Sequence, residues 1–213
     1  MRKPLLFLSA ALLFVAGLAF TPGRQANGWV SIFDGKTFNG WKVTEESPST
    51  FTIEDGAIVV AGPRAHLFYE GPVGNHNFKN FEWKAQVKTM PGSNSGMFIH
   101  TEYQPKGWPS KGYEIQVNQS HTDWRKTGSV YALQDVKEVF VKDNEWYTEH
   151  IIVNGKNVII KVNDKVINNY TEPDSISNGA ARKKLSSGTL ALQGHDPKSK
   201  VYFKDIMVKV LPD

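Results

Sequence analysis

The chain has 213 residues, of which 40% are hydrophobic and 22% are charged, with a formal net charge of +4 and no cysteine. This length is enough for one domain with its own core. Without cysteine, disulfides, thiolate chemistry and lipid attachment to a cysteine are excluded. The basic residues are scattered, so nucleic-acid binding, which needs a basic stripe interleaved with aromatic residues, is not expected.

The first residues have the pattern of a secretory signal peptide. Arg2 and Lys3 precede the continuous apolar run Leu5–Phe14, and Gly17-Leu18-Ala19 is a small-residue cleavage site. The apolar run is short for a stable transmembrane helix, which makes an uncleaved membrane anchor the less favoured interpretation. We therefore expect a signal peptide over residues 1–19, no stable membrane anchor, and a periplasmic or secreted protein.

After a polar spacer over residues 20–27, strand signals recur about every ten residues. Four apolar residues alternate strictly with four polar ones in Phe81–Lys88, the pattern of a half-buried strand. The turn signals Asn154-Gly155 and Asn163-Asp164 predict two successive hairpins. No 3.6-residue apolar period occurs beyond the signal peptide, so a single all-β domain over residues 28–213, a sandwich or jelly roll, is predicted. Its strands are expected at Trp29–Phe33, Phe51–Ile53, Ala57–Ala61, His66–Tyr69, Phe78–Lys88, Ser95–His100, Gly112–Val117, Ser129–Leu133, Tyr147–Val153, Val158–Val162, Thr189–Gln193 and Val201–Val210.

Three of these segments carry side chains two residues apart that suit a site for a polar small molecule. The pairs are Glu114 with Gln116, Phe98 with His100, and Gln193 with His195. Residues i and i+2 of a strand point to the same face of a sheet. We therefore expect the three pairs to line one surface with acid, amide and imidazole groups.

Ordered motifs over nearly the whole of residues 28–213 resemble the 3-keto-disaccharide hydrolase domain family of exported bacterial proteins. The similar segments are Ile32–Trp41, Asn94–Phe98, Gly112–Val117, Thr127–Tyr131, Trp146–Glu149, Leu192–His195 and Val201–Ile206. The resemblance implies a concanavalin A-like jelly roll of two curved antiparallel sheets with a sugar site on the concave face. It also implies substrates in which glucose carries a ketone at C3, made beforehand by a sugar 3-dehydrogenase as pathway partner. A C3 ketone acidifies the C2 hydrogen, so a general base can remove it, the C1 substituent can leave by β-elimination, and water can add back.

Glu114 and His195 are the first candidates for this chemistry. A partly desolvated carboxylate or an imidazole can act as a general base or as a metal ligand. The competing interpretations are a solvated surface carboxylate and a structural histidine bonded to a turn. Asp196 could orient His195 or could initiate the turn into Pro197. Family members often carry an aspartate where this chain has Gly194, so any role of that aspartate is missing here.

His100 is the third catalytic candidate, although the family commonly has an arginine at this position. A histidine could donate to an enolate oxygen but lacks the permanent charge of arginine. Glu114, His100 and His195 could also bind a divalent metal as a mixed nitrogen and oxygen ligand set. No cofactor is certain, and the metal requirement stays open.

Two predicted loops are long enough to border the site. They carry Trp108, and Trp124 with Arg125; aromatic rings can stack on sugar faces and arginine can donate to sugar oxygens. Tyr131 and Asp135 are borderline candidates. The predicted substrate-binding residues are therefore Gln116, Gln193, Trp108, Trp124, Arg125, Tyr131 and Asp135. Trp29, Trp41 and Trp83 are expected to pack in the core.

The leading hypothesis is an exported hydrolase or lyase that cleaves 3-keto-glucosides. The alternative is a non-catalytic carbohydrate-binding module of the same fold, which would use the same aromatic and polar residues without turnover. A retaining glycosidase needs two carboxylates about 5 Å apart. The run Glu114–Gln119 offers amides where the second and third acids of such an enzyme would stand, so this reaction is disfavoured.

Overall fold

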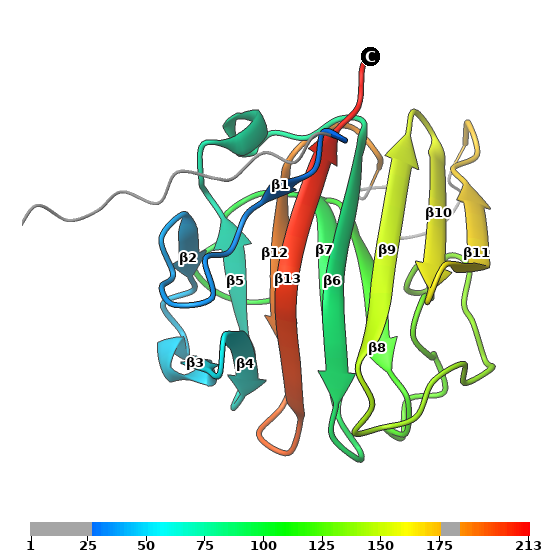
Figure 1. Cartoon of the computed structure of the whole chain (residues 1–213). Coiled ribbons are helices and arrows are strands. Elements are labelled where there is room, and N and C mark those ends of the chain that lie inside the picture. The colour runs from blue at the N-terminus through cyan, green and yellow to red at the C-terminus, as the bar shows by residue number, and fades with distance from the viewer. Residues whose placement is uncertain (1–26, 176–183) are drawn as a thin grey trace, which may run out of the picture.

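The structure of the protein, a computed structural model, describes residues 27–175 and 184–213 (Figure 1). The expected signal peptide, and the expected spacer apart from Asn27, lie outside the described residues. Two short 3-10 helices, η1 (Pro48–Thr50) and η2 (Val73–His76), accompany thirteen strands in this part of the chain. No helix among the described residues is long and apolar enough to cross a membrane.

The strands form two antiparallel sheets, so the prediction of an all-β sandwich is confirmed (Figure 1). The eight-stranded sheet has the order β11-β10-β9-β6-β13-β4-β3, with β1 paired to β13, and the five-stranded sheet has the order β2-β5-β12-β7-β8. The bounds of the first sheet are β1 (Val30–Ser31), β3 (Phe51–Glu54), β4 (Ala57–Ala61), β6 (Phe81–Thr89), β9 (Tyr147–Asn154), β10 (Asn157–Val162), β11 (Lys165–Thr171) and β13 (Lys200–Val210). Those of the second are β2 (Trp41–Val43), β5 (Ala65–Tyr69), β7 (Asn94–Thr101), β8 (Tyr113–Asn118) and β12 (Thr189–Gly194).

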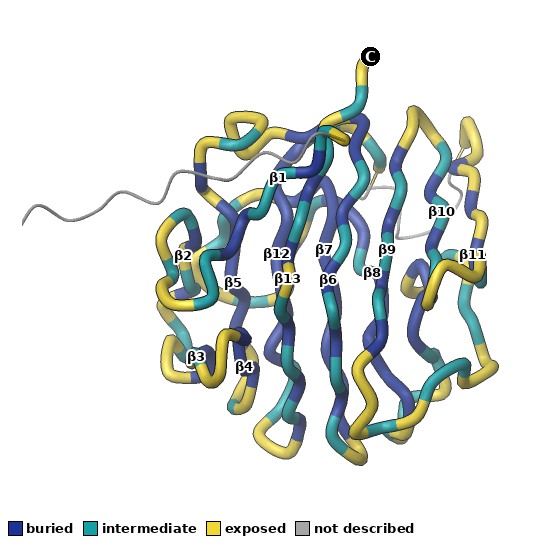
Figure 2. Tube along the Cα trace, in the orientation of Figure 1, coloured by how far each residue is buried: buried dark blue, intermediate teal, exposed yellow. Residues whose placement is uncertain are grey.

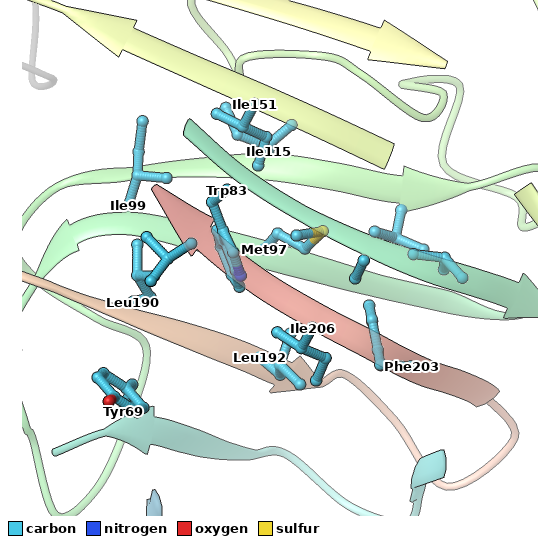
Figure 3. Packing of buried hydrophobic residues seen from close by; sticks show 14 of the residues in the cluster. Tyr69, Trp83, Met97, Ile99, Ile115, Ile151, Leu190, Leu192, Phe203 and Ile206 are labelled. Carbon is cyan, nitrogen blue, oxygen red and sulfur yellow. The ribbon is translucent and has the colours of Figure 1, made fainter. Parts of the chain in front are cut away.

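The core lies between the two sheets and is built from the inward-facing half of each alternating strand (Figures 2 and 3). Strand β6 shows the predicted alternation of buried and half-buried residues along its whole length. Trp83 of β6 and Phe203 of β13 meet Met97 and Leu192 of the opposite sheet in the layer between them (Figure 3). Because side chains of the five-stranded sheet alternate too, its other set of residues faces away from this core.

The strand predictions fail at two places. Strand β2 was not predicted, because its three residues are too few to show a period. The segment Ser129–Leu133 was predicted as a strand but forms isolated bridges, in which Val130 pairs with both Ile115 and Gln134. A positive φ of 60° at Ala132 turns the chain back there. This turn lies at the edge of β8 and brings residue 131 beside the sheet.

Glu149 of β9 gives the fold an ionisable group inside the core. It occupies an inward position between Tyr147 and Ile151 and is fully buried. Its Oε1 has no hydrogen-bond partner, and its Oε2 accepts only a long 3.4 Å bond from the Tyr147 hydroxyl. Burial raises the pKa of Glu149 well above its usual value, with the Tyr147 bond opposing weakly. Folding therefore favours the protonated form of this carboxyl group.

We expect Glu149→Gln to remove part of the pH dependence of stability. A carboxyl whose pKa is raised by folding stabilises the native state less as pH rises from the unfolded pKa towards the folded one. Wild type should lose stability through this group as pH rises above the ordinary range of a glutamate, and the variant should lose less. Urea unfolding over a range of pH values measures this. Parallel curves for both proteins would contradict it.

Candidate functional site

A pocket of about 210 Å³ lies on the face of the five-stranded sheet that points away from the core. Strands β7, β8 and β12 form its floor because Glu114 and Gln116 alternate with the core residue Ile115 along β8. Trp108, from the segment between β7 and β8, and Tyr131 form parts of its wall. The lining residues are Asn94, Phe98, Trp108, Glu114, Gln116, Tyr131, Gln193 and His195.

Six of the ten candidate residues thus line one pocket: Glu114, His195, Gln116, Gln193, Trp108 and Tyr131. Asn94 and Phe98 line it as well, and neither was predicted to bind. Phe98 was expected on the correct face, but its apolar ring gave no reason to assign it a role. Asn94 belongs to the Asn-Ser-Gly sequence of the family motif. An asparagine beside a glycine in a strand could also have indicated a position that binds a ligand.

The Glu114 carboxylate of β8 is positioned by an amide of β12, two strands away, and by the missing side chain of Gly96 in β7, the strand that lies between them. Gln193 Nε2 donates a 2.7 Å hydrogen bond to Glu114 Oε1. The carboxylate lies across Gly96 of β7, where a Cβ atom would stand 2.7 Å from Oε1 and 2.9 Å from Cγ. A glycine inside a strand often marks such a close approach. Gly96 therefore leaves the space in which the Glu114 side chain lies.

We expect Gly96→Ala to displace the Glu114 side chain without unfolding the protein. Gly96 lies in a regularly paired part of β7, so alanine meets the carboxylate and not a backbone restriction. A displacement of this kind should lower catalytic efficiency roughly 10- to 100-fold. Steady-state kinetics, with a thermal melt to confirm folding, measures the effect, and unchanged activity would show that the position of Glu114 does not matter.

Two buried amide oxygens in the pocket floor have no hydrogen-bond partner among the described residues. They are Oε1 of Gln116 and Oε1 of Gln193, and both side chains are almost completely buried. The amide nitrogens are used, since Gln193 donates to Glu114 and Gln116 donates to Asn94 Oδ1 at 3.3 Å. A buried acceptor without a donor is costly. These oxygens are suited to accept hydrogen bonds from the hydroxyl groups of a ligand.

His195 follows β12 and is oriented by the next residue. Its Nδ1 lies 2.9 Å from Asp196 Oδ2, and Asp196 also accepts from the Ser199 hydroxyl at 2.7 Å and the Lys198 amide at 2.8 Å. Burial alone would raise the pKa of Asp196, but the bonds from Ser199, His195 and Lys198 outweigh it and lower the pKa to about 2. Because an ionised carboxylate only accepts, Nδ1 of His195 carries a proton and the neutral ring keeps its lone pair on Nε2.

His121 completes a cluster with His195 and Asp196, in which one ligand atom from each residue lies within 4.8 Å of the others. The His121 Nε2 lies 3.9 Å from Asp196 Oδ2, while Nδ1 accepts the Asp123 amide at 3.1 Å. Burial, followed by the charge of His195, lowers the pKa of His121. His121 was not predicted, because only the folding of the segment after β8 brings it to His195.

The metal set predicted from sequence is not assembled. Glu114, His100 and His195 do not gather, and within the described part of the chain the cluster of His121, His195 and Asp196 is the group close enough to share a cation. Its hydrogen bonds do not suit a metal, because binding through His121 Nε2 would place a proton on Nδ1 against the Asp123 amide. Asp196 is likewise already engaged by His195 and Ser199. The cluster is better arranged to hold and orient protons.

The prediction that His100 faces the site is wrong, and a β-bulge is the reason. Between Phe98 and Thr101, strand β7 has two residues where β12 has one, and His100 has a positive φ of 52°. The bulge turns the ring to the core side, where it packs 5.6 Å from the Phe81 ring. Its Nε2 donates to the Lys79 carbonyl and its Nδ1 accepts the Ser186 amide. Burial lowers the pKa of His100, so it is a neutral structural histidine.

The Trp108 ring is placed by a second buried histidine. His66 of β5 packs edge-on against Trp108 at 5.6 Å and against Phe98 at 5.4 Å. Trp108 also lies 5.5 Å from the His195 ring, and its own side chain is 44% exposed. An exposed indole with a fixed orientation at a pocket wall is suited to stack on the face of a sugar ring.

Trp124, Arg125 and Asp135 do not line the pocket but adjoin it through Tyr131. The Arg125 guanidinium lies over the rings of Tyr131 and Trp124, and its Nε is 3.3 Å from Asp135. Burial and the nearby charges of Asp123 and Glu114 raise the pKa of Tyr131, although Arg125 opposes this. Tyr131 therefore keeps its hydroxyl proton and can donate a hydrogen bond at neutral pH.

The two antiparallel sheets give the protein the sandwich fold of galectin-like and concanavalin-like lectins. Its sequence matches the 3-keto-alpha-glucoside-1,2-lyase-like domain over residues 28–209, and the chain belongs to that family. The resemblance described from the motifs is thus confirmed.

Similar proteins of known description agree with this assignment. The chain is 30% identical to a 3-keto-disaccharide hydrolase of Bacteroides thetaiotaomicron, over 68% of this chain and 59% of that protein, so the match spans about three-fifths of the relative. A crystal structure from Parabacteroides distasonis, described provisionally as a glycosyl hydrolase, has a TM-score of 0.73 and 27% identity, covering 88% of this chain and 95% of that one. The carbohydrate-binding module CBM66 of Bacillus subtilis shares the fold alone, with a TM-score of 0.58 and 12% identity over 80% of this chain and 95% of that one.

Proposed function

We propose that the protein cleaves 3-keto-glucosides, with a 3-keto-disaccharide as substrate. Membership of the 3-keto-alpha-glucoside-1,2-lyase-like family and the name of the Bacteroides relative support this activity. The observation that carries it is the composition of the pocket. The pocket contains His195, whose tautomer is fixed by Asp196, and the amide oxygens of Gln116 and Gln193, which have no hydrogen-bond donor among the described residues.

The pocket suits the glycosyl ring of such a substrate. Sugar hydroxyl groups can donate to the buried oxygens of Gln116 and Gln193, and Trp108 supplies an aromatic wall. Glu114, which accepts from Gln193, also lines the pocket, where its carboxylate can contact a substrate hydroxyl group. These contacts would hold the ring with its reacting carbon atoms near His195.

The proposed reaction begins with transfer of the C2 proton to a base. The electron pair of the C2–H bond then forms an enolate with the C3 ketone. Collapse of the enolate creates the C1–C2 double bond and breaks the bond from C1 to the glycosidic oxygen, which leaves with a proton as an alcohol. Addition of water to C1, with a proton returned to C2, completes a net hydrolysis; without it the reaction stops as a lyase step.

We assign the base to His195 and the enolate donor to Tyr131. The Asp196 carboxylate holds Nδ1–H of His195, which leaves the Nε2 lone pair to take the proton. Tyr131 lines the same pocket and keeps its hydroxyl proton, so it can donate to the developing oxyanion. In this assignment Tyr131 takes the donor role that His100 was predicted to have.

The proposal includes export and a pathway partner. The signal-peptide pattern over residues 1–19 supports a periplasmic or secreted enzyme. Because ordinary glucosides lack a C3 ketone, an oxidoreductase acting on the C3 hydroxyl must supply the substrate.

Incubation of the purified protein with 3-keto-trehalose and with trehalose, followed by NMR, tests the function. We expect cleavage of the keto sugar alone. Binding of either sugar without product would replace this proposal with a carbohydrate-binding module. A parallel reaction with chelator tests the divalent ion: loss of activity there would mean that a metal takes part and that our interpretation of the histidine cluster is wrong.

A further inference from the structure

A second aromatic surface lies just outside the pocket, and we call Trp124, Arg125 and Tyr131 the Trp124 platform. The Arg125 guanidinium carbon lies 4.8 Å from the centre of the Trp124 ring and 4.6 Å from that of Tyr131. The Trp124 side chain is 47% exposed and that of Tyr131 is 38% exposed. Folding alone does not require two large aromatic rings to be exposed to solvent around one arginine. Such an exposed group of rings suggests a binding surface.

The Trp124 platform is rigid before any ligand arrives. Arg125 Nη1 lies 3.5 Å from Asp123 Oδ1, and Nε lies 3.3 Å from Asp135 Oδ1. Buried Asn118 of β8 donates to the main-chain oxygens of both Asp123 and Arg125, at 2.8 and 2.7 Å. A preorganised surface loses little conformational entropy on binding.

The charges of this region point to a neutral ligand. Arg125 and Lys137, whose Nζ lies 5.3 Å from the centre of the Trp124 ring, are matched by Asp123 and Asp135. These two cations and two carboxylates offset one another, which disfavours the selection of an anionic sugar or a phosphate. Flat aromatic faces beside guanidinium donors suit the ring and hydroxyl groups of a neutral sugar.

The size of the pocket favours one sugar ring inside it and a second sugar ring outside it. Pockets for drug-sized ligands begin at about 300 Å³, and this one measures about 210 Å³. A single pyranose ring suits that space. Tyr131 belongs both to the pocket wall and to the Trp124 platform, so the two surfaces are continuous.

We infer that the Trp124 platform binds the leaving-group sugar of a disaccharide while the pocket holds the keto ring. This inference rests on the proposed function and adds the residues that recognise the second ring, so that neutral disaccharides are preferred to glucosides with a small aglycone. The Trp124 ring stacks on the second pyranose, and Arg125 donates to its hydroxyl groups.

Kinetics of Trp124→Ala on two substrates tests the inference. For 3-keto-trehalose we expect kcat/KM to fall about tenfold, mostly through KM, which is the change that about 1.4 kcal/mol of binding makes. For methyl 3-keto-glucoside, which has no second ring, the fall should be less than about twofold. Trp146→Ala is the matched control, because Trp146 is also exposed but packs on Tyr202 of the eight-stranded sheet. It should change neither value.

Equal losses on both substrates, or none on 3-keto-trehalose, would overturn the inference while leaving the reaction intact. If wild type turns over neither substrate, the proposed function fails. A binding measurement then tests by itself whether the Trp124 platform binds a second sugar ring. Calorimetric titration with trehalose and with methyl glucoside should then show tighter binding of trehalose in wild type, and Trp124→Ala should abolish the difference. Equal affinities in wild type would refute the subsite.

Discussion

Replacing His195 with glutamine should lower kcat for a 3-keto-glucoside by roughly 10²- to 10⁴-fold, the usual contribution of a positioned acid–base group. Glutamine nearly matches the imidazole in size and can still hydrogen-bond Asp196, but it cannot take up a proton. The dependence of kcat/KM on pH should change as well, because only a neutral imidazole can accept the C2 proton. Stopped-flow or NMR assays over a range of pH values measure both effects.

His76→Gln is the matched control for this variant, since His76 is exposed in η2 and bonds only the Gly71 carbonyl. A melting temperature close to that of wild type would show that His195→Gln is folded. If its kcat stays within twofold of wild type at every pH, His195 is not the base. Exchange of the C2 hydrogen with solvent deuterium gives a second readout, and it should slow in parallel with kcat.

Glu114→Gln should reduce kcat/KM by roughly 10- to 100-fold, because a hydrogen bond to a charged group is worth about 1.5–3 kcal/mol. The amide removes the negative charge that accepts from Gln193 and from the substrate hydroxyls. The new amide oxygen can still accept from Gln193 Nε2 at the Oε1 position, so the variant keeps this contact and loses the charge. We expect a larger change in KM than His195→Gln produces.

The control for the carboxylate is Glu54→Gln, because Glu54 is exposed at the end of β3 in the other sheet and pairs only with Lys200. Full activity of Glu114→Gln would remove Glu114 from the reaction. A loss greater than that of His195→Gln would exchange the roles and make Glu114 the base.

The parts of the fold that the sequence predicts well are those governed by neighbouring residues. The alternation in Phe81–Lys88 and the turn at Asn154-Gly155 are local patterns, and both correspond to observed elements. The same alternation placed Glu114, Gln116 and Gln193 on one face correctly. It failed at His100, because a single extra residue in β7 reverses the face and nothing in the amino-acid types marks the bulge.

The parts of the site that could not be predicted depend on contacts between distant segments. His121 meets His195 across 74 positions of sequence only because the segment after β8 folds back along the sheet. His66 supports Trp108 from another strand, and its alternation partner Phe68 gives no indication of that contact. Gly96 is part of a family motif in the sequence. Why a glycine is needed there, to leave space for the Glu114 carboxylate, can be seen only in the structure.

The loop that carries His195 and Asp196 also connects β12 of one sheet to β13 of the other. This loop is hydrogen-bonded to the residues at the start of β7. Ser199 Oγ accepts the Asn94 amide at 2.9 Å, and the Ser93 hydroxyl accepts the Lys200 amide at 2.8 Å. The ring of His195, which we propose as the base, is therefore anchored where the two sheets of the sandwich are joined. Any sliding of one sheet over the other would move this ring relative to the pocket floor. If His195 is the base, we therefore expect substitutions in the packing between the sheets to change its activity without touching the pocket.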